Sequence, residues 1–255
     1  MPCTLSPAVT AAISFPPLWW STTKLCAATS WGGGDGPGHS VRSSIVSGRF
    51  ITLEGIEGVG KSTHLDFVCR YLRDHGREVV ATREPGGTAL GEALRQVLLN
   101  PAYNGMSGDA ELLLMFAARA EHLARVIQPA VAAGRWVVSD RFTDATYAYQ
   151  GGGRGLDKSR IAALEQWLQG SLRPQLTVLL DAPVAVSLAR ARQRGGEVDR
   201  FEQERHGFFE RVRQAYLDIA AAQPQRVRVI DASGDLAAVQ GALRQVLDDC
   251  LAGAS

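Results

Sequence analysis

The sequence has few of the residues on which metal-binding and disulfide-stabilised proteins depend. Only four of its 255 residues are cysteine, at Cys3, Cys26, Cys69 and Cys250, and no two of them form a C-x-x-C pair. This spacing argues against a zinc site and a disulfide framework, so we expect a reduced, cytoplasmic compartment. No apolar run approaches the roughly 20 residues that cross a bilayer, so we expect no membrane partner.

The sequence also lacks an excess of charge of either sign. Its 27 Lys and Arg face 26 Asp and Glu, which gives a formal charge of +1. Such a chain has no net basic field for nonspecific binding of nucleic acid or anionic lipid, and nucleic acid is not an expected partner. Any anion site must therefore be local.

The first 48 residues differ in composition from the rest. Ser, Thr, Gly and Pro fill 24 of these positions, and the only charged residues are Lys24, Asp35 and Arg42. We expect a disordered N-terminal extension at 1–48 and one folded domain at 49–255. Two other interpretations stay open. The segment could be an organelle transit peptide, although such peptides are rich in Arg and this segment has almost none. Alternatively, the start of the protein could be assigned too far upstream, with Val41 or Val46 as the true first residue.

After residue 48, short β-rich apolar runs alternate with longer helical patterns, which is typical of βαβ units on a parallel sheet. The sequence therefore predicts a three-layer α/β fold with a five-stranded parallel sheet. The predicted strands are Phe50–Glu54, Glu78–Arg83, Trp136–Asp140, Leu176–Asp181 and Val227–Asp231. The predicted helices are Ser62–His75, Ala89–Leu99, Asp109–Ala133, Lys158–Gly170, Pro183–Arg192, Gly207–Ala222 and Leu236–Leu251.

The strongest motif is the run Gly55–Thr63, which matches G-x-x-x-x-G-K-S between a strand and a helix and so predicts a P-loop. In such a loop the backbone N–H groups cradle phosphate, Lys61 reaches the β and γ phosphates, and the Ser62 hydroxyl ligates Mg²⁺. The alternative is a glycine-rich turn with a solvated lysine. The expected ATP-binding residues are Gly55, Glu57, Gly58, Val59, Gly60, Lys61, Ser62 and Thr63.

A nucleoside-triphosphate site alone does not say what happens to the phosphate. A GTPase switch needs an N-K-x-D motif, but the sequence has only Asn100 and Asn104, and neither precedes Lys. The D-x-x-G match at Asp231–Gly234 follows the last predicted strand, too late in the chain for a switch. A kinase for a small phosphorylated acceptor needs a second anion site instead.

Arginines at two predicted strand ends supply such a site. Arg83 closes the second strand and Arg141 follows the third, and the carboxyl ends of parallel strands open on one crevice. Arg119 lies in an apolar run where an unpaired guanidinium is costly to bury, so a ligand would explain it. For each arginine alone, a salt bridge or a solvated position is the ordinary alternative. Guanidinium groups suit bidentate phosphate binding.

Five runs together resemble the thymidylate kinase (dTMP kinase) family of the bacterial type, from about Arg49 to the C-terminus. They are the phosphate loop with Glu57, Thr82–Thr88, Phe116–Arg119, Asp140–Phe142 and Tyr147–Gly155. The resemblance implies that Arg83, Arg95 and Arg141 bind the monophosphate or the transferred phosphoryl group, that Arg119 and Gln150 read the thymine edge, and that Glu57 meets the 3′-hydroxyl.

The resemblance also implies how the base and sugar are held. Thr146 matches a hydroxyl near the base, and Tyr149 matches the aromatic that crowds the 2′ carbon and favours deoxyribose. Phe116 is the best candidate for the aromatic that stacks on the base. Met115 stands at the family's usual spacing of four residues before Arg119, so which of the two covers the base stays open. Asp140 is expected at the dTMP site and as a Mg²⁺ ligand through water.

Family members also carry an arginine-rich lid, and residues 190–204 resemble it. The phosphate loop has no Arg between Gly55 and Gly60, so a lid arginine is expected to supply the missing charge. A solvated, basic helix end is the alternative. The expected catalytic residues are Lys61, Arg141, Arg190, Arg192 and Arg194, with Arg194 the first choice among the lid residues.

The resemblance implies phosphoryl transfer from ATP to dTMP with Mg²⁺. The residues predict that this transfer is direct and in line, because they offer positioning and charge-stabilising groups rather than a nucleophile and base pair. Another nucleoside or nucleotide kinase, and a nucleotide-binding regulatory module without transfer activity, are the alternatives. The resemblance further implies a homodimer. The histidines His64, His75, His122 and His206 form no recognisable constellation.

Overall fold

The computed structural model describes residues 48–193 and 199–253. Within the expected N-terminal extension it describes only Gly48, and residues 194–198 of the expected lid lie outside the described part of the chain, as do 254–255. The described residues belong to one compact unit.

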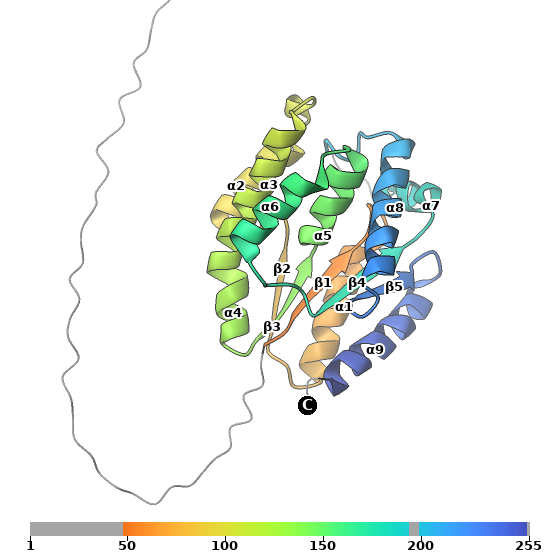
Figure 1. The fold of residues 1–255 in the computed structure, drawn as a ribbon. Coiled ribbons are helices and arrows are strands. Elements are labelled where there is room, and N and C mark those ends of the chain that lie inside the picture. Colours follow the sequence, from red (N-terminus) through yellow and green to blue (C-terminus); the bar gives the residue numbers. More distant parts are fainter. Residues whose placement is uncertain (1–47, 194–198, 254–255) are drawn as a thin grey trace, which may run out of the picture. The chain divides into compact units, whose positions relative to one another are not determined.

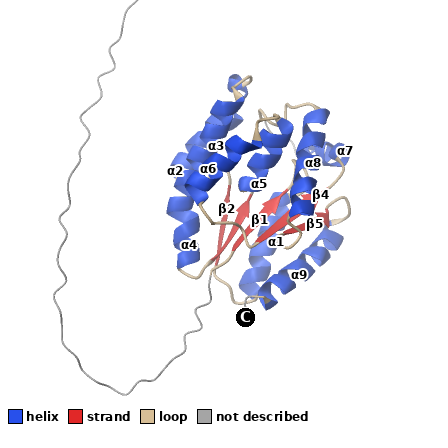
Figure 2. Cartoon of the chain, in the orientation of Figure 1, coloured by secondary structure: helices blue, strands red, loops and turns tan. Residues whose placement is uncertain are grey.

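The strands form one parallel sheet in the order β2-β3-β1-β4-β5, which confirms the predicted five-stranded architecture (Figures 1 and 2). Each strand begins and ends within one residue of its predicted bounds. β1 is buried throughout and β4 nearly so, because both lie inside the sheet with helices on either face. The strands are β1 (Phe50–Glu54), β2 (Val79–Arg83), β3 (Trp136–Asp140), β4 (Leu176–Asp181) and β5 (Val227–Asp231).

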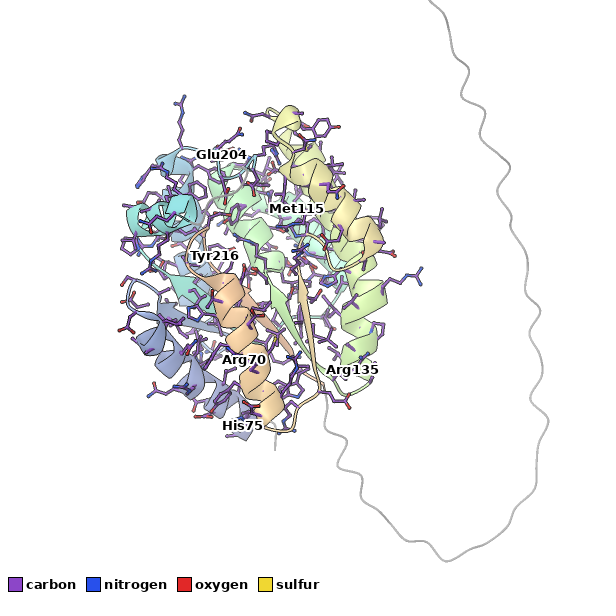
Figure 3. All side chains as sticks on the ribbon, turned by 180° about the vertical axis from the view of Figure 1, so that it is seen from behind. Arg70, His75, Met115, Arg135, Glu204 and Tyr216 are labelled. Atoms are coloured by element: carbon purple, nitrogen blue, oxygen red, sulfur yellow. The ribbon has the colours of Figure 1, made fainter. Side chains whose placement is uncertain are left out.

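Helices cover both faces of this sheet. α1 and α9 pack together on one face, which is turned toward the viewer in Figure 3. Right-handed crossovers place the helices that follow β2, β3 and β4 on the opposite face. The helices are α1 (Lys61–Asp74), α2 (Ala89–Leu99), α3 (Gly108–His122), α4 (Gln128–Ala132), α5 (Thr143–Thr146), α6 (Lys158–Gln169), α7 (Val184–Gln193), α8 (His206–Ala222) and α9 (Leu236–Ala252). In the described ranges, no helix combines the length and the apolar character that a membrane span requires.

The long helix predicted at Asp109–Ala133 is interrupted. α3 ends at His122, a π-helical turn, η2, spans Leu123–Ile127, and α4 continues from Gln128. Pro129 has no N–H to donate to the preceding turn, so it is accommodated only in the first turn of a new helix. The interruption therefore follows from Pro129, which the apolar periodicity of this segment did not take into account.

A second π-helical segment, η3 (Tyr147–Gly153), was not predicted, because glycine normally disfavours helices. Its glycines allow α8 to approach closely. A Cβ at Gly152 would lie 2.6 Å from the Ala215 Cβ, and one at Gly153 would lie 2.5 Å from the Phe208 ring. Packing against α8 thus stabilises a helical segment that local propensity opposes.

Candidate active site

A cavity of about 410 Å³ opens at the carboxyl ends of β1, β2 and β3. Met115 and Glu204 lie at this end of the domain, whereas His75 and Arg135 lie at the opposite end (Figure 3). The phosphate loop, the segment after β2, the segment after β3, α3 and η3 all contribute to its wall. Its lining includes Glu57, Gly58, Gly60, Lys61, Ser62, Thr63, Glu84, Pro85, Arg95, Met115, Arg119, Asp140, Arg141, Phe142, Thr146, Tyr149, Gln150 and Arg190.

The phosphate loop has the backbone that its glycines permit. Gly55, Gly58 and Gly60 have φ values of 135°, 79° and 88°. At Gly58 a Cβ would lie 1.9 Å from the Ser187 carbonyl oxygen, so no other residue fits without movement of the backbone. α1 begins directly after this loop, and its N-terminal N–H groups and dipole favour an anion at the loop.

Lys61 lies over the same loop. Its ammonium donates to the carbonyl oxygens of Gly55 at 3.1 Å and Ile56 at 2.9 Å. Burial, with the nearby positive charge of Arg141, lowers the pKa of Lys61 to about 8. A phosphate at the loop would supply the negative charge that keeps this lysine protonated.

Arg141 occupies the centre of the cavity wall. It is the only non-glycine residue of the described chain with a positive φ, 71°. Its Nη2 donates to Glu57 Oε1 at 2.9 Å and to the Tyr149 hydroxyl at 2.8 Å, and its Nη1 donates to the Tyr216 hydroxyl at 3.1 Å. Burial opposes the charge of Arg141, but the facing Tyr149, Tyr216 and Glu57 hold its pKa well above the ordinary value. Such a strained backbone is typical of functional positions.

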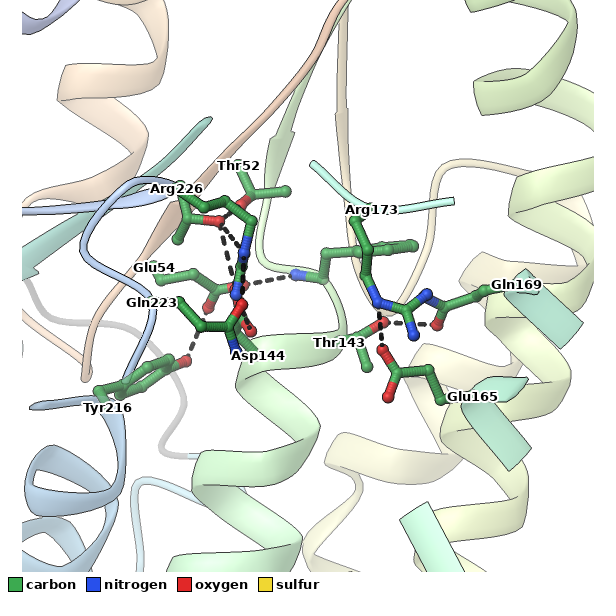
Figure 4. Close-up of polar contacts among 12 residues, drawn as sticks. Thr52, Glu54, Thr143, Asp144, Glu165, Gln169, Arg173, Tyr216, Gln223 and Arg226 are labelled. Atoms are coloured by element: carbon green, nitrogen blue, oxygen red, sulfur yellow. Dashed lines mark hydrogen bonds and ion pairs between the residues drawn. The ribbon is translucent and has the colours of Figure 1, made fainter. Parts of the chain in front are cut away.

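Glu54 supports this arrangement from the end of β1. Its carboxyl group is fully buried, accepts from the Tyr216 hydroxyl at 2.7 Å and from the Phe142 backbone N–H at 2.8 Å, and lies near Asp144 (Figure 4). Burial, followed by the negative charge of Asp144, raises the pKa of Glu54 to about 8. The folded protein therefore favours the protonated form of this carboxyl.

We expect Glu54→Gln to remove a pH dependence of stability. In the unfolded chain Glu54 loses its proton near its ordinary pKa of 4.5, but in the folded chain only near 8. The free energy of unfolding of the parent should therefore fall as pH rises from about 4.5 to 8 and level off above. Relative to the glutamine variant, the parent should lose at least about 2 kcal/mol between pH 5 and 8, since a tenfold change in proton affinity is worth roughly 1.4 kcal/mol. Urea unfolding at both pH values measures this, and parallel pH curves for the two proteins would contradict it.

Arg119, on α3, lines the same cavity as the phosphate loop. Its Nε donates to Glu84 Oε2 and its Nη2 donates to the Thr146 hydroxyl, at 2.8 and 2.9 Å. Its Nη1 is buried and has no partner among the described residues. An unpaired buried donor is costly, so a ligand acceptor at this place would satisfy it. His122, also buried, holds Glu84 Oε1 from the other side at 2.9 Å.

The structure separates the two candidates for covering the base. Phe116 is not part of the cavity lining; it is buried against Leu112 and Ile161, with the Arg119 guanidinium 4.7 Å from its ring centre. Met115 lines the cavity instead, as does Phe142. The preference for Phe116 is therefore wrong for this cavity. Residues one position apart on a helix point about 100° apart, so only one of the two neighbours can face the cavity, and that one is Met115.

The two remaining phosphate-binding candidates differ in position. Arg95 lines the cavity and donates to the Pro85 carbonyl oxygen at 3.0 Å, and burial lowers its pKa. The structure does not bring Arg83 into the lining. Its exposed guanidinium pairs with Glu92 on α2, with Nη2 2.7 Å from Oε2.

The lid arginines are also unequal. Arg190, on α7, lines the cavity, but its guanidinium donates to the carbonyl oxygens of Ala232, Ser233 and Gly234. Arg192 is exposed and outside the cavity lining, and Arg194 lies outside the described residues. In this conformation Arg190 thus ties α7 to the loop after β5.

The oxygen ligands at the loop fit Mg²⁺. Ser62 lines the cavity, and Asp140 Oδ1 is buried without a hydrogen-bond partner in the described part of the chain. In those same residues, no group of three or more His, Cys, Asp and Glu could hold a metal ion. Mg²⁺ bound with a nucleotide needs only one or two protein oxygens beside the phosphates and water, so this sparse set suits it.

Sequence reasoning missed several residues of the site. Glu84 and Glu111 are buried carboxylates that hold Arg119 and Gln150, and Tyr216 holds Arg141. The signal for Glu111 was present: it is an acid at the start of the apolar run that also contains Arg119. A buried charge needs a partner, and this argument applies to Glu111 as much as to Arg119.

Comparisons with known proteins agree with these features. The family model described as "Thymidylate kinase" matches residues 53–243. Thymidylate kinase of Pseudomonas putida is 62% identical over 195 residues, which are 76% of this chain and 92% of that protein. That of Chromohalobacter salexigens is 59% identical, over 82% of this chain and 99% of the relative. The crystal structure of thymidylate kinase from Ehrlichia chaffeensis is 34% identical with a TM-score of 0.64, covering 79% of this chain and 99% of that one. The matched span runs from β1 to α9 and so includes the whole cavity.

Proposed function

This chain belongs to the thymidylate kinase family and phosphorylates dTMP to dTDP with ATP, and from that premise we propose that both substrates meet in the cavity at the carboxyl ends of β1, β2 and β3. The observation that carries the proposal is that the phosphate loop and the pair Arg119 and Gln150 line one cavity. A phosphate cradle and base-reading groups in one cavity suit transfer between two bound nucleotides.

The phosphate loop, Gly55 to Thr63, would hold the phosphates of ATP through its backbone N–H groups, with Lys61 on the β and γ phosphates. Ser62, and Asp140 through water, would hold Mg²⁺, which neutralises phosphate charge when bound. Arg190 and the loop after β5 are joined at the edge of the cavity, where they would flank the adenine.

The acceptor would lie with its phosphate near Arg95 and Arg141 and its base between Met115 and Phe142. Arg119 Nη1 would donate to thymine. Tyr149 would exclude a 2′-hydroxyl, because its hydroxyl is held by both Glu57 and Arg141 and its ring cannot swing away without breaking these bonds. Deoxyribose selectivity would therefore come from exclusion.

No nucleophile and base pair takes part in this proposal, and the γ-phosphoryl group would pass directly from ATP to the dTMP phosphate in line. Arg141 would stabilise the charge on the transferred oxygens, with Arg194 of the lid as the added cation. Arg192 is a weaker candidate because it is exposed on the last turn of α7.

An acceptor scan tests the function. With ATP and Mg²⁺, we expect kcat/KM for dTMP to exceed that for UMP, dCMP and dGMP by at least about a hundredfold, because a site with fixed hydrogen-bonding groups strongly rejects mismatched ligands. Coupled ADP release measures the rates. Comparable kcat/KM for UMP or dCMP would overturn the base and sugar assignments, and transfer to no monophosphate would overturn the kinase assignment.

We further propose that the enzyme is a cytoplasmic homodimer joined through α2, α3 and α6. Large apolar side chains are exposed on all three helices: Leu90 and Val97, seven residues apart on one face of α2, Leu113 on α3 and Trp167 on α6. These helices lie side by side in the domain (Figure 1). Large apolar side chains exposed on neighbouring helices support a protein interface at this face. Light scattering of the assayed enzyme would contradict the proposal if it gave the mass of one chain.

A further inference from the structure

Glu111, on α3, is a fully buried carboxylate that the function described so far does not use. Its Oε1 accepts from Gln150 Nε2 at 2.7 Å. It also pairs with two guanidinium groups, those of Arg200 at 2.6 Å and Arg154 at 3.3 Å. Glu111 thus lies directly behind a residue of the cavity wall and shares no surface with solvent.

The contact with Glu111 determines which way the Gln150 amide faces. A carboxylate only accepts hydrogen bonds, so the NH₂ end of the amide must face Glu111 and the carbonyl oxygen must face elsewhere. Gln150 is itself buried and lines the cavity. Turning the amide over would place its oxygen against the Glu111 carboxylate, which is repulsive and leaves the buried NH₂ group without that acceptor.

This orientation matters because thymine and cytosine differ in hydrogen-bond polarity. Thymine presents an N3–H donor and an O4 acceptor, whereas cytosine presents an N3 acceptor and an N4 amino donor. An amide oxygen fixed toward the cavity can accept from thymine N3–H. Cytosine would require the same amide to turn over and present its NH₂ group.

We propose that Glu111 is a positioning residue for base selection: by holding the Gln150 amide in one orientation it favours the thymine edge and rejects cytosine. Arg119 is held in a similar way by Glu84 and Thr146, which leaves only a donor for the base. Two buried carboxylates thus orient the two groups that face the base. The inference rests on the proposed placement of the base between them.

The experiment compares kcat/KM for dTMP, dUMP and dCMP in Glu111→Gln and the parent. A glutamine at 111 can donate or accept, so it permits either orientation of Gln150. We expect the ratio of dTMP to dCMP to fall at least about tenfold, because kcat/KM for dCMP rises. The ratio of dTMP to dUMP should stay constant, since uracil has the same edge as thymine.

Two further variants separate this role from a structural one. Glu204→Gln makes the same chemical change at the other partner of Arg154, outside the cavity lining, and should leave the base ratios unchanged. Gln150→Leu should itself lower the dTMP to dCMP ratio, and adding Glu111→Gln to it should change that ratio no further, because Glu111 acts through Gln150.

If Glu111→Gln does not fold, Glu111→Asp decides, since it keeps the charge for Arg200 but withdraws the oxygen from Gln150. An unchanged dTMP to dCMP ratio, or an equal loss for all three substrates, overturns the proposal while the kinase function stands. A parent that does not phosphorylate dTMP overturns the function itself. A Gln150→Leu protein with the parent's ratios shows that Gln150 does not read the base.

Discussion

Lys61→Ala is expected to lower kcat for dTMP phosphorylation by about a thousandfold while the protein stays folded, since removal of one preorganised charge-stabilising donor costs about 10² to 10³ in rate. The ammonium of Lys61 contacts only backbone carbonyl oxygens of its own loop among the described residues. Shortening the side chain removes these two hydrogen bonds to backbone carbonyl oxygens and breaks no side-chain hydrogen bond among the described residues. The substitution therefore weakens the stabilisation of the phosphate groups during transfer and not the stability of the fold.

Lys158→Ala is the matched control for this change. Lys158 is the other lysine of the described domain, exposed at the start of α6 and outside the cavity lining. Its variant should keep the parent's kcat. Steady-state kinetics at saturating ATP measure kcat for the Lys61→Ala and Lys158→Ala variants, and circular dichroism checks that both are folded. A folded Lys61→Ala enzyme with near-parent kcat would show that the phosphate loop does not bind the transferred phosphate.

The sheet was predictable almost residue by residue, because β1 and β4 are short, mostly apolar runs that are bounded by residues which break a strand. Phe50–Glu54 ends at the first glycine of the phosphate loop, and Leu176–Asp181 is soon followed by Pro183. Local sequence alone fixed these boundaries. By contrast, η3 contains three consecutive glycines, and its helical form depends on α8, about 60 residues further along the chain.

The site was predictable where one motif carries the chemistry and unpredictable where distant residues meet. The phosphate loop follows from its motif, and the position of Arg141 at the cavity follows from strand order, whereas Arg83 at the end of β2 turns to Glu92 instead of the cavity. The pairing of Gln150 with Glu111 joins residues 39 positions apart, and that of Arg141 with Tyr216 joins residues 75 apart. Neither partner can be found without the fold, because any of several buried acids or hydroxyls could have met them.

The preference for Phe116 over Met115 shows the same limit on a smaller scale. Both lie in the apolar run of α3, and if chemistry alone decided, an aromatic phenylalanine would be preferred to methionine for stacking on a nucleobase. Only the rotation of α3 about its axis decides which one lines the cavity, and that rotation is set by packing against α2 and α6. Met115 brings a flexible thioether to this wall, which adapts to a flat ring without requiring a fixed stacking angle.

Arg141→Lys is expected to lower kcat by at least about a hundredfold, because an arginine that stabilises the transferred phosphoryl group is worth about 10³ to 10⁵ in rate and lysine recovers only part of it. Both side chains carry a positive charge, and both face the same backbone cost at φ 71°. The substitution therefore keeps the charge and removes only the planar, multidentate shape of the guanidinium group. One ammonium cannot span Glu57, Tyr149 and Tyr216, which the guanidinium joins with two nitrogens.

The kinetic signature of Arg141→Lys distinguishes positioning from substrate binding. If the guanidinium acts mainly on the transferred group, kcat should fall far more than KM for dTMP rises. Arg213→Lys is the matched control: Arg213 makes a bidentate pair with Asp181, at 2.7 and 2.8 Å, outside the cavity lining, and its variant should keep the parent's kcat. A rise in KM at unchanged kcat for Arg141→Lys would instead place this arginine on the dTMP phosphate alone. The charge needed in the transition state would then have to come from Lys61 and the lid.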